Sequence, residues 1–111
     1  MADMEPSGIG LECASTALAS VTLEAKPPGM VWPRLTTATH LGVIATGDSA
    51  EAAARAASTD MLAWLRQARA MSAPAAYMLL ATAAEARFSI LSYKPYVCVC
   101  KIARARLPRV A

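Results

Sequence analysis

The middle of the chain, residues 48 to 86, restricts the fold most, because it is rich in alanine and contains two helix starts. Asp48 can cap a first helix, and Glu51 three residues later completes a start that resembles a capping box. Good helix formers then continue to Arg69. The apolar spacing predicts a core-facing side made of Ala53, Ala57, Met61, Trp64 and Leu65.

A second helix is predicted from Ala73 to about Ala86. Ser72 can cap it, and Pro74 stands in its first turn, where the missing N–H costs nothing. Only Ala70 to Ser72 remain between the two helices. A connection this short predicts a tight helical hairpin.

Extended segments are predicted before the hairpin. Residues Leu11 to Glu24 have period-two patterning, which indicates a long, half-buried strand or a bent pair. Lys26 to Gly29 form a turn, because two prolines fix φ and the glycine permits a positive φ. A second extended stretch, rich in threonine, valine and isoleucine, runs from Arg34 to Ala45.

Strand patterning returns after Arg87, and Tyr93 to Pro95 read as a turn. The next strand is predicted from Tyr96 to Leu107. It is apolar on both faces at its start, which indicates a covered position, and its arginine-rich end predicts an emerging edge. Strands at both ends of the chain, forming one sheet with a central two-helix hairpin packed on it, define an α+β fold.

With 111 residues, the chain is predicted to form a single domain, residues 1–111. Apolar residues make up 56% and charged residues 17%, which excludes intrinsic disorder. The net charge of +3 is too small to indicate a nucleic-acid partner. The longest apolar run, Ala73 to Ala84, is too short to span a membrane. Three cysteines and an acidic N-terminus favour a reducing cytoplasm.

Three groups of residues could carry chemistry, and each favours a structural interpretation. His40 has no partner at metal-ligand spacing. Cys98 and Cys100 share one strand face and could bind a soft metal, but buried core cysteines are the preferred interpretation. The basic cluster is interpreted as a solvated strand edge rather than an anion or nucleic-acid site. It consists of Lys101, Arg104, Arg106 and Arg109.

The N-terminal segment stands apart because it places Asp3, Glu5 and Glu12 close together in the sequence. Paired carboxylates can bind a hard cation or divide into acid and base roles. The alternative interpretation is a solvated terminus with no chemical role.

The same segment opens a resemblance to a known family. Residues 3 to 8, followed by Glu12, resemble the Gly-Asp-Gly-Glu-Val-Ser-Gly segment of the acetamidase/formamidase family, with Ala2 and Met4 at positions where that family has glycine. The resemblance continues in order and spacing along nearly all of the chain. It is carried by Pro33-Arg34, His40 before Gly47, residues 50 to 53, residues 60 to 65, residues 76 to 80, residues 84 to 89 and residues 107 to 109.

The resemblance implies a C-terminal portion of a longer metal-dependent hydrolase. Family members hydrolyse short linear amides such as formamide and acetamide, and commonly form homo-oligomers. Carried over to this sequence, Glu5 is the candidate general base and Asp3 the candidate ligand of a divalent metal, zinc or calcium. The remaining metal ligands are expected in the missing N-terminal half. The alternative is a non-catalytic α+β module that binds itself or a partner.

Overall fold

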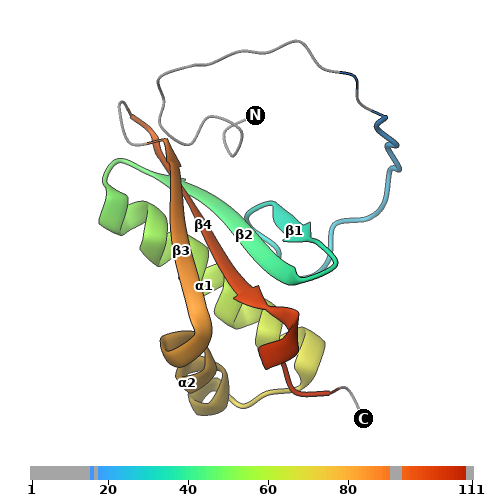
Figure 1. Ribbon diagram of the computed structural model, residues 1–111, viewed down its shortest axis with the longest axis vertical. Coiled ribbons are helices and arrows are strands. Elements are labelled where there is room, and N and C mark those ends of the chain that lie inside the picture. Colours follow the sequence, from blue (N-terminus) through green and yellow to red (C-terminus); the bar gives the residue numbers. More distant parts are fainter. Residues whose placement is uncertain (1–15, 17, 91–93, 110–111) are drawn as a thin grey trace.

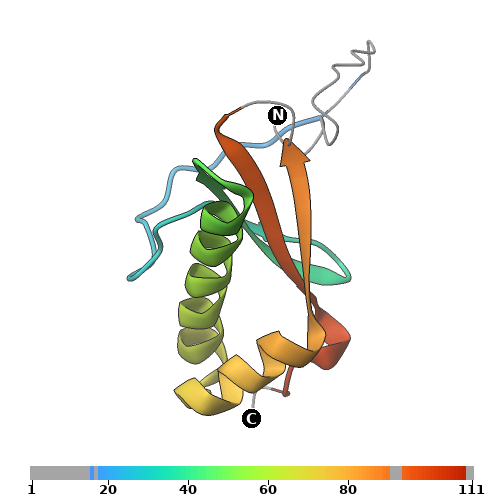
Figure 2. The ribbon, with the colours of Figure 1, turned by 90° about the vertical axis from the view of Figure 1, so that its left-hand side faces the viewer.

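The computed structural model describes residue 16 and residues 18–90 and 94–109. A four-stranded antiparallel sheet with strand order β1-β2-β4-β3 forms the frame of the molecule, and two helices complete the α+β fold (Figure 1). The predicted fold class is therefore confirmed. One helix, α1, runs along one face of the sheet (Figure 2).

The first two strands form a hairpin where the sequence pattern predicted one continuous stretch. β1 (Arg34–Thr36) pairs with β2 (His40–Gly47), so the prediction of an unbroken strand from Arg34 to Ala45 is wrong. The chain reverses because the Thr37 hydroxyl accepts the backbone N–H groups of Thr39 and His40, at 3.3 and 2.9 Å. Threonine is common in strands, so a threonine-rich turn has the same local pattern as a strand.

Helix α1 (Ala50–Arg69) confirms the predicted helix, but its cap is one residue later than expected. Ser49 is the N-cap, and its hydroxyl oxygen accepts the N–H of Ala52 at 3.0 Å. Glu51 does not reach back to the cap in the way a capping box requires; it pairs instead with Arg55 on the helix surface at 2.6 Å. The helix ends at Ala70, which adopts the left-handed conformation with φ of 51°.

The core lies between α1 and the sheet. Four of the five side chains predicted for the inner face of α1 are buried; the fifth, Trp64, is half-buried and stacks under the Arg34 guanidinium, 4.9 Å from the ring centroid. Alternation along the strands supplies the opposite wall. Its buried members are Leu41, Val43, Ala45, Cys98, Cys100 and Ile102.

Helix α2 (Ala73–Ala83) begins as predicted, with Ser72 as N-cap and Pro74 in the first turn. It ends three residues earlier than predicted, because β3 (Ala84–Ile90) begins at once and pairs with β4. Pairing with a neighbouring strand therefore outweighs helix propensity from Ala84 onward. In Figure 2, α2 crosses below the end of α1 and leads directly into β3.

Strand β4 (Tyr96–Ala103) lies between β2 and β3, which confirms its predicted covered position. The prediction that it continues to Leu107 as an edge is wrong. After Ala103 the chain forms the 3₁₀ turn η2 (Arg104–Arg106), and the Arg104 side chain donates to the carbonyl oxygen of Thr37 at 3.0 Å.

The described residues before β1 contain the predicted turn. Gly29 has φ of +74°, and Met30 N–H donates to the Pro27 carbonyl at 3.2 Å. Of the predicted strand Leu11 to Glu24, residue 16 and residues 18–24 are described, and they form no strand. An extended segment becomes a strand only when a neighbour supplies ladder hydrogen bonds. Within the described residues, no helix has both the length and the apolar character needed to cross a bilayer.

Candidate functional site

Asp3 and Glu5, the two residues predicted to bind metal and to act as base, lie outside the described residues, as do Glu12 and Cys13. Their predicted roles stay predictions. The site that the structure does describe is on the sheet itself, on the face turned away from α1, which we call the distal face.

The distal face is defined by the register of the strands. Gly42, Lys101 and Glu85 are partners in one row across β2, β4 and β3, and Val99 and Arg87 belong to the next row. Because successive side chains alternate between faces, all five side-chain positions are on the opposite face from the core residues. His40 lies diagonally from Lys101 on the same face.

A small depression on this face, which we call the distal hollow, has a volume of about 120 Å³. Gly42 leaves its floor open, because no side chain stands there. Leu35 and Val99 form the apolar part of the lining. Its polar part consists of Thr37 and three nitrogen-bearing side chains, those of His40, Arg87 and Lys101.

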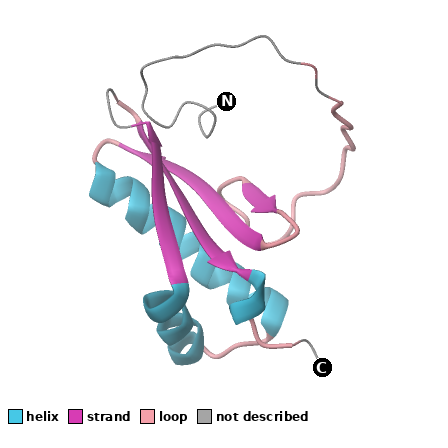
Figure 3. Cartoon of the chain, viewed as in Figure 1, coloured by secondary structure: helices cyan, strands magenta, loops and turns pink. Residues whose placement is uncertain are grey.

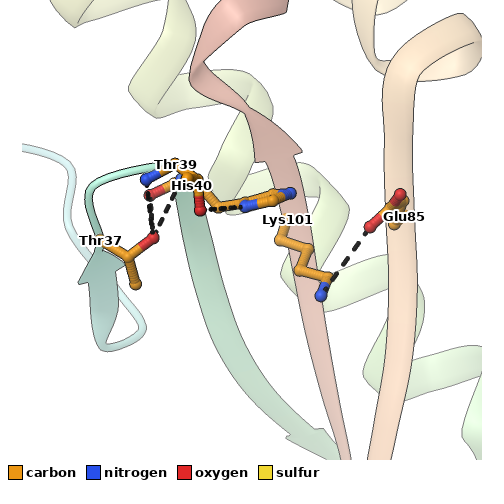
Figure 4. Close-up of polar contacts among 5 residues, drawn as sticks. All are labelled: Thr37, Thr39, His40, Glu85 and Lys101. Atoms are coloured by element: carbon orange, nitrogen blue, oxygen red, sulfur yellow. Dashed lines mark hydrogen bonds and ion pairs between the residues drawn. The ribbon is translucent and has the colours of Figure 1, made fainter.

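The β1–β2 turn holds His40 at the rim of the hollow (Figure 4). The Thr39 hydroxyl and the His40 Nδ1 are 2.8 Å apart. The Thr37 hydroxyl accepts the His40 backbone N–H and also donates to the His40 carbonyl at 3.3 Å. When the Thr39 hydroxyl donates to Nδ1, the ring proton is on Nε2, and Nε2–H is then a free donor.

Among the residues that the structure describes, Lys101 pairs with one carboxylate. Its Nζ is 3.8 Å from Oε2 of Glu85, and the side chains are 30% and 64% exposed (Figure 4). At this distance and in contact with water, the attraction between the two charges is weak. With Arg87 on the same face, the hollow keeps an excess of positive charge.

The two described cysteines are core residues, as predicted. Burial raises the pKa of Cys98 from 9.0 to about 11, and the neighbouring Cys100 adds to the effect. Burial also raises the pKa of Cys100, although a hydrogen bond from Ser58 opposes this. Metal binding needs thiolates, so both thiols are poor ligands near neutral pH. No cluster of three or more His, Cys, Asp or Glu side chains suited to a metal occurs among residues 16, 18–90 and 94–109.

A larger groove, of about 470 Å³, runs between α1 and residues 29 to 32. Its lining is mostly apolar, with Val31, Trp32 and several alanines of α1. Asp60 is buried beside it, and its Oδ2 accepts the Trp32 backbone N–H at 3.2 Å. Asp60 therefore joins the segment before β1 to α1, which is a structural role.

The described elements thus define an α+β unit with a core on one side of its sheet and a polar hollow on the other. Two solved structures share this fold. The acetamidase of Yersinia enterocolitica matches with 25% identity and a TM-score of 0.69, over 72% of this chain and 24% of that chain. The acetamidase of Bacillus halodurans matches with 31% identity and a TM-score of 0.60, over 64% of this chain and 24% of that chain.

The chain is therefore acetamidase-like, which confirms the resemblance to the acetamidase/formamidase family and is consistent with a C-terminal portion of it. It spans about a quarter of the length of each solved acetamidase. No protein-family model and no curated protein matches the sequence.

Sequence reasoning missed the distal hollow. His40 was judged by its neighbours in the sequence, whereas its partners on the face come from β3 and β4, about 45 to 60 residues away. The signal that could have found it is the alternation of side chains along a strand. Glu85 and Arg87 in β3 are two residues apart, as are Val99 and Lys101 in β4, so each pair lies on one face of the sheet.

Proposed function

We propose that this chain takes part in the hydrolysis of short linear amides, formamide and acetamide being the simplest, as the C-terminal portion of an acetamidase-like hydrolase. The observation that carries the proposal is the match in fold and sequence to two solved acetamidases. In this reaction, water adds to the amide carbon, the carbon–nitrogen bond breaks, and the products are a carboxylate and ammonia.

The candidate catalytic groups are those of the N-terminal segment. Glu5 is proposed as the general base that takes a proton from the attacking water, and Asp3 as one ligand of a divalent metal, zinc or calcium. When bound, such a metal polarises the amide carbonyl. The described residues do not supply a complete ligand set. Further ligands would therefore come from the acetamidase-like polypeptide that corresponds to the other three quarters of the solved acetamidases.

Ammonia release from formamide and acetamide, with added zinc or calcium, tests the proposal directly. The chain, combined with a separate polypeptide that supplies the other three quarters of an acetamidase, is expected to release ammonia. Glu5→Gln is expected to lower the rate by about 100-fold or more, because an amide cannot accept the proton. Glu24→Gln is the matched control, since Glu24 is an exposed carboxylate outside the acidic segment. A rate that is unchanged in Glu5→Gln would remove the proposed base.

A second candidate function is a non-catalytic module that binds a second copy of itself. Its support is the exposure of three large apolar side chains within residues 18–23: Leu18, Val21 and Leu23 are 99%, 95% and 100% exposed. Contiguous exposed apolar groups often mark an interface. Light scattering after size exclusion is expected to show a dimer that dissociates in the triple variant with serine at these positions. A monomer at all concentrations would exclude this function.

A further inference from the structure

We propose that the distal hollow binds a short-chain monocarboxylate, with acetate or propionate as the simplest examples. The inference rests on the shape and charge of the hollow alone, and it does not depend on the amide hydrolysis proposed above.

The charge of the hollow selects an anion. Lys101, Arg87 and His40 come from three different strands and line the same depression. Lysine and arginine offer only donors, and charge-assisted hydrogen bonds to a carboxylate are stronger than neutral ones. Lys101 is partly shielded from water, with 30% of its side chain exposed, which strengthens its interaction with an anion.

The shape selects a small ligand with an apolar end. The volume of about 120 Å³ suits a molecule of a few heavy atoms. Leu35, which is 36% exposed, offers methyl groups to the alkyl part beside the nearly buried Val99, and Arg87 and Lys101 in the same lining can bind the carboxylate. The floor exists because residue 42 is glycine: a Cβ there would lie 3.5 Å from both Leu35 Cβ and Val99 Cγ1.

Glu85 opposes the anion, because its carboxylate already approaches Lys101 at 3.8 Å. The distance is long for an ion pair, and the Glu85 side chain is 64% exposed, so it can turn toward water. The structure therefore predicts that removing the charge of Glu85 strengthens carboxylate binding. A purely structural role for this cluster would not predict that gain.

The test is a titration of the full chain with sodium acetate, at fixed pH and at an ionic strength held constant with sodium chloride. His40 is the single histidine, so its ring Hε1 resonance reports on the hollow without ambiguity. The backbone amide of Gly42 is the second reporter. Both resonances are expected to shift and saturate with acetate, and neither is expected to move with acetone, a neutral molecule of similar shape.

The variants make the test specific. Lys101→Gln and Arg87→Gln are each expected to weaken acetate binding at least about fivefold, because each removes a charge-assisted donor. Glu85→Gln is expected to tighten it about twofold or more, since it frees Lys101. Gly42→Ala is expected to weaken it by filling the floor. Arg106→Gln, an exposed cation of η2 away from the hollow, is the matched control and should leave binding unchanged.

Several outcomes would overturn the proposal. Shifts that grow without saturation, or equal shifts with acetone, would show that acetate has no site. Equal losses in Lys101→Gln and Arg106→Gln would show general attraction to a cationic protein. Gly42 is buried and Lys101 is half-buried, so each variant is first checked for folding: an amide spectrum unchanged outside the hollow confirms that it is folded. The result is separate from the amidase assay, since either experiment can fail while the other succeeds.

Discussion

Two glycines of β2 illustrate how differently single residues contribute to this fold. A Cβ on Gly47 would lie 2.5 Å from the backbone nitrogen of Ala53 and 2.9 Å from the carbonyl carbon of Ala52, and backbone atoms cannot turn aside. On Gly42 the nearest atoms are at 3.5 Å, which is ordinary contact. The start of α1 therefore packs directly on Gly47.

We expect Gly47→Ala to lower the free energy of unfolding by about 1–3 kcal/mol, the usual cost of overpacking. Gly42→Ala should change it by less than about 0.5 kcal/mol. Urea denaturation of both variants measures the difference. Equal stability of the two variants would contradict the close approach of α1 to β2.

Met61 is one of the largest fully buried side chains in the described part of the chain, whereas Met78 of α2 is 61% exposed. Met61→Ala should cost about 2–5 kcal/mol through lost burial and the cavity left behind. Met78→Ala, the same chemical change at the surface, should cost less than about 0.5 kcal/mol. The difference between their urea midpoints is the measurement, and similar midpoints would mean that Met61 is not a core residue.

The raised pKa of Cys98 predicts a loss of stability in alkali. Its pKa is about 11 in the folded chain against 9.0 for a free thiol, so the folded state holds the proton more tightly than the unfolded state does. The contribution to stability is complete below about pH 9 and is lost as the pH rises through about 11. Unfolding midpoints measured over this range should fall less steeply for Cys98→Ala. If the unfolding midpoints of the two proteins fell equally with pH, the raised pKa of Cys98 would be contradicted.

At the scale of elements, the caps of the helices can be tested in the same way. Ser49→Ala should destabilise the protein by about 1 kcal/mol, because the Ala52 N–H loses its acceptor. Asp48→Ala should cost less than about 0.5 kcal/mol, since the N-cap of α1 is Ser49 and not Asp48. Thermal or urea unfolding measures the stability of both variants. A larger loss of stability in Asp48→Ala than in Ser49→Ala would mean that Asp48 is the N-cap, as the sequence predicted.

The errors in sequence interpretation have a common physical origin, which is that pairing between strands is not local. The start of α2 and the buried face of α1 were predictable because their signals are local. Ser72 and Pro74 mark the start of α2, and the apolar spacing from Ala53 to Leu65 marks the buried face of α1. The early end of α2 at Ala83 and the end of β4 at Ala103 depend on neighbours across the sheet. The distal hollow was invisible for the same reason. The turn after Thr36 is the exception: local hydrogen bonds to Thr37 form it, but its threonines have the same sequence pattern as a strand.

At the scale of the whole molecule, the two faces of the sheet have different roles. α1 lies along one face of the sheet (Figure 3) and forms the apolar core with it. The hollow lies on the other face. The distal face is of mixed character, because it carries the buried Val97 and Val99 as well as Arg87 and Lys101. In the solved acetamidases the matched part is only about a quarter of the chain. The proposed activity therefore belongs to an assembly larger than the described fold.

The central claim is that this chain performs the role of the matched quarter of an acetamidase. The most direct measurement replaces that quarter of the Yersinia enterocolitica enzyme with residues 1–111 and follows ammonia release from acetamide. We predict release well above that of the enzyme with the quarter deleted, and loss of that release when the inserted chain carries Glu5→Gln. A chimera that is folded by circular dichroism but releases no ammonia would contradict the claim.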